Sequence, residues 1–289
     1  MRLIGREAKL MQARKHLVHH RHTLIVGPVG IGKSALLHAA VEGCERVVAL
    51  DQITPFRPAL LDLFKQLHAQ GRLTLPDVDT AYLDWDELTP HVSHLNSVEA
   101  VDLLAPLLAD TVLLIDDLDG ITPTIARLLE PLVETALILG AVTTLDASPE
   151  LTRWRLHFQL LPLAPLTPEA SRELLWASAD REALPDADVF EQHVLHMADG
   201  NPLAIRELCR QARRTPLRDP ADIRHLTHEA GIRDVDLTPL LLIVGACAVA
   251  IRFLALGLND IDTYILAGIL GAFLLVSRYM FYRSLRRRG

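Results

Sequence analysis

The sequence has 289 residues, half of them hydrophobic, and a formal net charge of −7. The charge is uneven, because six arginines and two aspartates from residue 237 onward leave −11 for residues 1–236. An acidic body argues against a broad nucleic-acid surface, since neutralising phosphates requires clustered lysine and arginine. The three cysteines, Cys44, Cys209 and Cys247, form no CxxC pair, which argues against a disulfide framework and a zinc site.

The first part of the chain alternates between helical and strand patterns. Residues 6–20 are amphipathic, and 23–26 form a short apolar run that is followed by glycines and by helix formers over 34–40. A second strand is expected at 47–50 and a further helix at 58–70. Because strands that alternate with helices pair in parallel, the pattern predicts an α/β fold with a parallel sheet.

Residues 71–96 have no clear hydrophobic period, and we interpret them as an inserted loop whose role is open. Alternation then resumes, with helices and strands expected at residues 97–109, 112–115, 123–135, 136–143 and 157–161. The run at 112–115 is typical of a central strand buried on both faces. These elements predict a sheet of about five strands sandwiched by helices, in a core domain at residues 1–161.

After Pro162 the pattern changes to helices only. Thr167 and Pro168 supply the cap and first-turn proline of one helix, and two more are expected over 189–198 and 202–213. The sequence therefore predicts a small all-α lid domain at residues 162–236.

The segment Gly27-Pro28-Val29-Gly30-Ile31-Gly32-Lys33-Ser34 matches the pattern GxxxxGK[ST] between a predicted strand and a predicted helix, the context of a phosphate loop. Glycines let main-chain N–H groups wrap the phosphates, and the helix N-terminus adds its positive dipole end. In this arrangement Lys33 contacts the β- and γ-phosphates, and the Ser34 hydroxyl binds Mg²⁺. The predicted ATP-binding residues here are Gly27, Pro28, Val29, Gly30, Ile31, Gly32, Lys33, Ser34 and Ala35.

Two carboxylates follow the strand at 112–115. Asp116 is expected to hold the magnesium ion through its water shell, and Asp117 to polarise the attacking water as a general base. The alternative is that these acidic residues only cap the next helix. Asp119 is interpreted as a turn or cap residue.

These motifs, the helical domain and the opening segment Leu3-Ile4-Gly5-Arg6-Glu7 together resemble the AAA+ and STAND groups of P-loop ATPases, over residues 3 to roughly 215. The resemblance implies that Leu3, Ile4 and Gly5 lie near the adenine. Most AAA+ members have Glu at the position of Asp117, whereas STAND members often have Asp. This difference favours STAND and leaves the rate of hydrolysis open.

The same resemblance implies further site residues. A polar sensor is expected at the end of the strand at 136–143, and Thr144 is our choice over Thr143, although both could be ordinary strand residues. Arg153 and Arg155 stand where AAA+ proteins place an arginine that contacts a neighbouring subunit's nucleotide. The alternative for this pair is that both are solvated.

The segment Gly200-Asn201-Pro202-Leu203-Ala204 is similar to the GxPLA motif of the STAND lid. The resemblance implies that Pro202 approaches the adenine and that Arg206, one turn further, senses phosphate. A glycine that ends one helix and a proline that starts the next would give the same letters.

Two apolar stretches follow, from Leu240 to Leu258 and from Tyr264 to Tyr282, each close to the roughly 20 residues that a bilayer demands. They predict a transmembrane hairpin at 237–283 that contacts lipid through residues 238–282. A buried hairpin is the alternative.

Orientation follows from charge. Arginines make the tail at 284–289 basic, and no N-terminal apolar run predicts a cleavable signal, so we expect a two-pass protein of the cytoplasmic membrane with ATPase domain and C-terminus in the cytoplasm. Arg252 lies inside the first stretch, at a cost of about 2.5 to 3.5 kcal/mol. It could snorkel toward Asp260 or Asp262, pair within an oligomer or line a pathway.

The sequence thus predicts a membrane-anchored, homo-oligomeric ATPase that couples lid movement to a membrane partner or a protein client. The alternatives are a slow ATP-dependent signalling switch, a membrane effector in which Arg252 contributes to a pore, and a DNA-handling ATPase. No helix-turn-helix or basic domain follows the lid in the sequence, which argues against the last of these.

Overall fold

A computed structural model describes residues 3–76, 78–80, 82–144, 157–182, 184–214 and 219–227, together with residues 250 and 253. The chain divides into two compact units, Met1–Gly231 and Ile232–Gly289, and the helices and strands with described bounds belong to the first. Apart from residues 250 and 253, the predicted hairpin and basic tail lie outside the described residues. Within the described part, no helix has the length and apolar character needed to cross a membrane.

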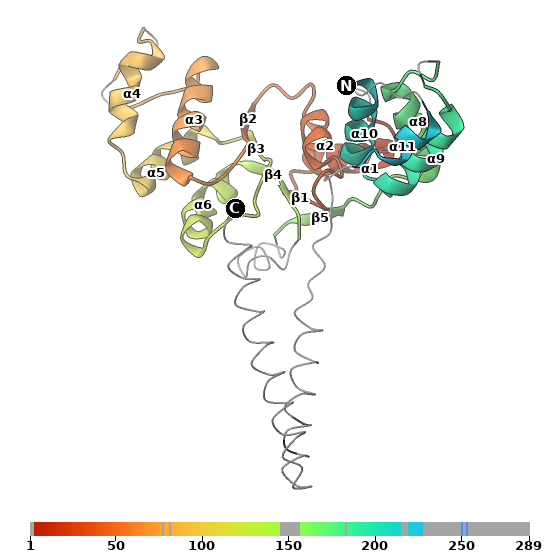
Figure 1. The fold of residues 1–289 in the computed structure, drawn as a ribbon. Helices are drawn as coiled ribbons and strands as arrows, with labels where there is room; N and C mark the ends of the chain where they lie inside the picture. Colours follow the sequence, from red (N-terminus) through yellow and green to blue (C-terminus); the bar gives the residue numbers. More distant parts are fainter. Residues whose placement is uncertain are drawn as a thin grey trace. The chain divides into compact units, whose positions relative to one another are not determined.

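Among the described residues, five parallel strands form one sheet in the order β2-β3-β4-β1-β5 (Figure 1). The strands are β1 (Thr23–Val26), β2 (Val47–Leu50), β3 (Val112–Ile115), β4 (Leu137–Val142) and β5 (Gln159–Pro162). β4 separates β1 from β3, with Val26 opposite Val142 and Ile115 opposite Gly140. Because all the pairs are parallel, the loops that follow β1, β3 and β4 lie at the same edge of the sheet.

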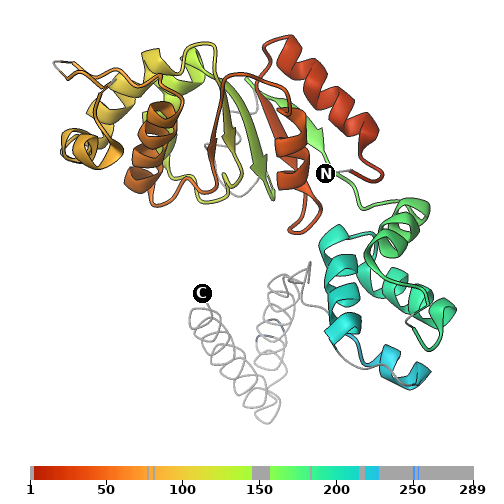
Figure 2. The same ribbon diagram turned by 90° about the horizontal axis from the view of Figure 1, so that it is seen from above.

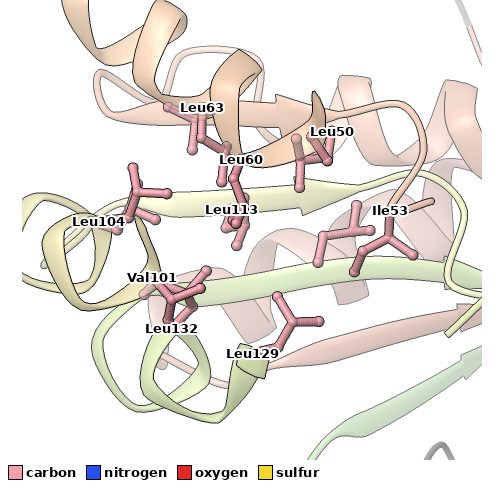
Figure 3. Close-up of a cluster of buried hydrophobic side chains, with 14 of the residues drawn as sticks. Leu50, Ile53, Leu60, Leu63, Val101, Leu104, Leu113, Leu129 and Leu132 are labelled. Carbon is pink, nitrogen blue, oxygen red and sulfur yellow. The ribbon is translucent and has the colours of Figure 1, made fainter. Parts of the chain in front are cut away.

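Helices cover both faces of this sheet (Figure 2). They are α1 (Glu7–Val18), α2 (Lys33–Ala40), α3 (Phe56–Ala69), α4 (Trp85–Ser93), α5 (Ser97–Leu107) and α6 (Pro123–Thr135). Successive strand residues point to opposite faces, so Leu113 and Ile115 pack with α3 to α6 whereas Leu114 packs with α1 and α2. Figure 3 shows the larger of these cores, in which α3 contributes Leu60 and Leu63. The predicted parallel sheet between helices is therefore confirmed.

The interpretation of residues 71–96 as a loop was wrong over Trp85–Ser93, which form α4. Asp84 and Glu87 form a capping box that begins this helix. Leu88 and Val92, four residues apart, are buried in the core against α3. Pro90 within the helix obscured this short periodic pattern.

A second group of helices follows β5, namely α8 (Pro168–Ser178), α9 (Ala187–Ala198), α10 (Pro202–Arg214) and α11 (Pro220–Arg224). Thr167 caps α8 through its side-chain oxygen, and Pro168 is the first helical residue, as predicted. These helices surround a separate core that includes Leu175, Phe190 and Leu208. Helix α11 was not predicted, because five residues are too short to show a period.

Candidate functional site

The predicted phosphate loop connects β1 to α2, and its glycines occupy positions that favour glycine. Gly30 and Gly32 have φ angles of +80° and +98°, in the left-handed region. Gly32 is the residue that precedes α2, and Ser34 is exposed in the first turn of that helix. The strand, loop and helix thus stand in the order that the motif requires.

Hydrogen bonds divide the main chain of this loop into two sets of groups. Each carbonyl oxygen from Gly27 to Ile31 accepts a hydrogen bond from within the protein. By contrast, certain N–H groups donate to no atom of the described residues, namely those of Val29, Gly30, Gly32, Lys33, Ser34 and Ala35. Unpaired N–H groups at a tight turn and at a helix N-terminus bind anions. The loop therefore has its acceptors occupied and its donors available to a phosphate.

The Lys33 side chain folds back onto the first residues of the phosphate loop. Its Nζ donates to the carbonyl oxygens of Gly27 at 2.7 Å and Pro28 at 3.2 Å. Burial lowers the pKa of Lys33, while the carboxylates of Asp119, Asp116 and Asp117 act in the opposite direction. The lysine is thus a positive charge that faces three acidic side chains from another loop.

Asp116 and Asp117 follow β3 and have different surroundings. The main-chain N–H of Asp116 donates to the Leu50 carbonyl at 2.9 Å, whereas its Oδ1 is buried without a hydrogen-bond partner among the described residues. Asp117 is exposed, and its Oδ1 accepts the N–H of Asp119 at 2.9 Å. A buried carboxylate oxygen without a donor fits a hard cation such as Mg²⁺, for which oxygen is the preferred ligand. In the described part of the chain, no group of three His, Cys, Asp or Glu side chains forms a ready-made metal site.

Asp119 connects the β3 loop to the end of β4. Its two carboxylate oxygens accept the N–H of Thr143 at 2.8 and 3.1 Å. Sequence reasoning assigned it only a turn or capping role and missed this contact across the sheet edge. Thr144, the predicted sensor, follows β4 at this edge and is exposed.

The N-terminal segment contacts both the sheet side and the lid. Leu3 packs against the core of α1 and α2, whereas Ile4 packs against the lid core. Gly5 has a φ of +67°, and a Cβ atom there would lie 2.6 Å from the Ala170 side chain of α8. These contacts place the predicted base-pocket residues between the two cores.

Arg6 was not predicted as a site residue, yet it contacts the phosphate loop directly. Its Nη2 donates to the Ile31 carbonyl at 3.1 Å, and burial lowers its pKa. Its Nε is buried without a partner among the described residues. The segment Leu3–Glu7 contains this residue, but the sequence alone does not reveal a hydrogen bond to a carbonyl 25 positions away.

The start of α10 also reaches the phosphate loop. Asn201 Nδ2 donates to the Val29 carbonyl at 3.0 Å, and the main-chain N–H of Leu203 donates to the Gly30 carbonyl at 3.2 Å. Pro202 stands between these two residues at the beginning of the helix, and Arg206 lies one turn further and is partly buried. Sequence reasoning selected Pro202 and Arg206 and missed Asn201.

Arg153 and Arg155 lie outside the described residues, as does Arg252 in the predicted hairpin. The remaining predicted site residues belong to the loops after β1, β3 and β4, the N-terminal segment and the start of α10. Direct hydrogen bonds join the loop to the N-terminal segment and to α10. The three carboxylates are connected to it through their charge interaction with Lys33.

Neither a protein-family model nor a curated protein matches this sequence. Among solved structures, the chain is similar to the Walker-type ATPase of Pyrococcus abyssi, with a TM-score of 0.55 and 14% identity, covering 89% of this chain and 77% of that chain. The RuvB Holliday junction branch migration motor of Thermotoga maritima gives a TM-score of 0.47 at 16% identity, covering 76% and 67% of the two chains. A STAND protein with a tetratricopeptide repeat sensor from Pyrococcus horikoshii gives 0.45 at 14% identity, covering 84% of this chain and 34% of that chain.

The fold is therefore similar to that of a Walker-type ATPase. It has the five-stranded parallel sheet in the order 2-3-4-1-5, flanking helices and a helical lid. At 14% identity the likeness concerns the fold alone.

Proposed function

We propose that this protein binds Mg-ATP at the phosphate loop and hydrolyses it, as a homo-oligomer anchored in the cytoplasmic membrane by residues 237–283. In this proposal, movement of the lid transmits the state of the nucleotide to a membrane partner or a protein client. The observation that supports nucleotide binding is the division of hydrogen bonds in the loop, where carbonyls are occupied and N–H groups are available. An arrangement of this kind suits a chain of phosphates and offers little to a neutral ligand.

A residue of this chain can be assigned to each step of the proposed reaction. The loop N–H groups and Lys33 bind the phosphates, so that Lys33 exchanges its bonds to Gly27 and Pro28 for phosphate oxygens. Ser34 and Asp116 would hold Mg²⁺, which offsets negative charge on the β- and γ-phosphates when bound. Asp117 keeps one oxygen engaged by Asp119 and accepts a proton from the attacking water with the other.

Binding and hydrolysis are tested with the purified full chain in detergent, by ATP titration and phosphate release in the presence of Mg²⁺. Lys33→Ala should weaken ATP binding by about 10- to 100-fold, the value of a hydrogen bond to a charged group. Lys65→Ala removes an exposed lysine of α3 and serves as the matched control. Equal ATP affinity and turnover in both variants would exclude the phosphate loop as the site.

A slow signalling switch is the second candidate. It is favoured by Asp117, because one carboxylate oxygen is already bonded to the Asp119 N–H and only the other is available to an attacking water. Comparing the rate at which bound ATP is hydrolysed in a single turnover with the rate of ADP release separates the two functions. Hydrolysis of bound ATP much faster than ADP release would exclude a switch that is timed by slow hydrolysis.

Assembly and membrane anchoring are tested separately from catalysis. We expect the full chain to remain in the membrane fraction after carbonate washing, because two apolar stretches of about 20 residues would span the bilayer. For oligomers, mixing Lys33→Ala subunits with Arg153→Ala or Arg155→Ala subunits should restore turnover if one of these arginines acts on a neighbour's nucleotide. The arginine variant then provides an intact nucleotide site, and the Lys33→Ala subunit provides the intact arginine. Release into the soluble fraction would contradict the anchor, and no recovery on mixing would contradict the shared site.

A further inference from the structure

Two of the five occupied carbonyls in the phosphate loop are held by the lid. Lys33 Nζ bonds to the carbonyls of Gly27 and Pro28 from within the loop, and Arg6 bonds to the carbonyl of Ile31. The carbonyls of Val29 and Gly30, in the middle, accept from Asn201 Nδ2 and from the Leu203 N–H. The centre of the loop therefore depends on donors that belong to another part of the fold.

Asn201 performs two tasks with its two carboxamide ends. Its Oδ1 accepts the N–H groups of Leu203 at 3.0 Å and Ala204 at 3.4 Å, which caps α10, while its Nδ2 donates to Val29. Asn201 as a whole is only 9% exposed. Asp and Ser can perform the capping task, but Asp has no N–H and Ser is too short to replace the amide.

The contact leaves no room for a side chain on the loop. A Cβ atom at Gly30 would lie 2.8 Å from Asn201 Oδ1 and 2.8 Å from the Leu203 Cβ. Asn201 is also fixed within the lid, since its N–H donates to the Ala198 carbonyl and its carbonyl accepts the Ile205 N–H. A rotation of α10 must therefore move the donor or break its bond to the loop.

The peptide bond converts this contact into an effect on phosphate binding. Because a peptide unit is planar and trans, holding the Val29 oxygen fixes the direction of the Gly30 N–H on the opposite side of the same unit. The Gly30 N–H donates to no described residue. Donation to the carbonyl also polarises the peptide unit and strengthens that N–H as a donor.

We propose that Asn201 is a positioning residue through which the lid sets the phosphate affinity of the loop. The inference rests on the proposed nucleotide binding and adds a specific coupling route to it. Thermodynamic linkage makes the coupling reciprocal, so phosphate that orders the loop also stabilises this position of α10. Loss of the Asn201 bond to Val29 should then weaken ATP and ADP binding and leave adenosine binding unchanged, because adenosine has no phosphate.

The test compares two asparagines that cap helices. Asn201→Ser and Asn201→Asp keep the cap of α10 and remove the donor to Val29. Asn96 caps α5 through the N–H groups of Val98 and Glu99 at 3.0 Å each, and no hydrogen bond joins it to the loop among the described residues, so Asn96→Ser and Asn96→Asp are the matched controls. The full chain in detergent is titrated with ATP, ADP and adenosine in the presence of Mg²⁺, and deuterium exchange of α10 is followed with and without ADP.

Both Asn201 variants should bind ATP and ADP about tenfold more weakly, with adenosine affinity unchanged and less protection of α10 by ADP. The Asn96 variants should bind all three ligands like the wild type. Wild-type ATP affinity in Asn201→Ser, with a loss only in the charged Asn201→Asp, would overturn the inference. An equal loss for adenosine and ATP would also overturn it, whereas a wild-type chain that binds no ATP would overturn the proposed function itself.

Discussion

The loops after β1 and β3 lie at the same edge of the sheet, yet they differ in how far their polar groups are hydrogen-bonded within the protein. After β1, the loop carbonyls are all paired with donors from Lys33, Arg6 and the start of α10. After β3, the buried Oδ1 of Asp116 has no partner among the described residues. The first loop has its acceptors bonded within the protein, whereas the second leaves one buried carboxylate oxygen without a donor. Under the proposed function, the contacts that stabilise the phosphate loop would also serve binding, whereas at Asp116 stability and metal binding would be opposed.

The largest effect on turnover is expected at Asp116, the proposed metal-binding residue. A change there should also affect stability, because a buried acceptor without a partner costs free energy of folding. Asp116→Asn should lower turnover by about 100-fold or more, since a metal ion at the phosphates contributes several kcal/mol. The same change should raise the stability of the metal-free protein by about 1 kcal/mol. Phosphate release measures the loss of turnover. Thermal melting with and without Mg-ATP measures the change in stability, since bound ligand should reverse the order of the two proteins. A metal-free variant less stable than the wild type would show that Asp116 is not a strained group.

Gly30→Ala tests the loop after β1, where the carbonyl groups are all bonded within the protein. The left-handed backbone alone costs alanine about 1 to 2 kcal/mol, and the new Cβ would also meet Asn201 and Leu203. Gly43→Ala carries the backbone cost alone, because Gly43 has a φ of +93° and a Cβ atom added there would have no other atom within 4 Å. We expect Gly30→Ala to lower the free energy of unfolding by about 1 kcal/mol more than Gly43→Ala, and to weaken ATP binding as well. Equal melting temperatures would argue against a close contact between loop and lid.

Asp119→Ala should have a smaller effect on turnover than Asp116→Asn. Asp119 connects the loop after β3 to the end of β4. The substitution removes both acceptors of the Thr143 N–H, at a cost of about 1 to 3 kcal/mol for a group left without a partner. Because Asp119 positions the end of β4, turnover should fall by several fold with little change in ATP affinity. Asp102→Ala, at an exposed position of α5, is the control. A loss of ATP affinity equal to the loss of turnover would assign Asp119 to binding instead.

The smallest effect is expected at the opposite edge of the sheet, where His22 accepts the Ile138 N–H at 3.1 Å through Nδ1. Burial, with a contribution from His157, lowers the pKa of His22 below its usual value of 6.5. The neutral form is thus favoured in the folded state, so its stabilisation is present above pH 6.5 and is lost as the pH falls below the depressed pKa. Melting measured from about pH 7.5 downward should show a loss of stability that is smaller in His22→Asn. An equal acid dependence in both proteins would show that other groups carry it.

Much of the fold follows from local patterns in the sequence. Strands at 23–26, 47–50 and 112–115 were predicted with the observed bounds, because short β-prone runs end at glycine or acidic residues. Helix α4 was missed because Pro90 interrupts a single buried pair of side chains. The capping box at Asp84 and Glu87 was the signal that could have revealed it.

The candidate site was predictable where a motif specifies the residues and not where contacts come from distant segments. Lys33, Ser34 and Asp116 follow from residue type and spacing. Asn201 acts on a carbonyl 172 residues away and Arg6 on one 25 residues away, and no periodicity encodes a bond to the main chain of another segment. Asp119 was placed in a turn correctly, but its contact with Thr143 depends on the order of strands in the sheet.

A structure of the full chain with Mg²⁺ and a non-hydrolysable ATP analogue tests the central claim most directly. We expect the phosphates within hydrogen-bond distance of the N–H groups of Gly30, Gly32 and Lys33. The metal should be bound by the Ser34 hydroxyl and held by Asp116 through its water shell, with Asn201 still bonded to the Val29 carbonyl. A nucleotide bound elsewhere, or phosphates held without the loop N–H groups, would contradict it.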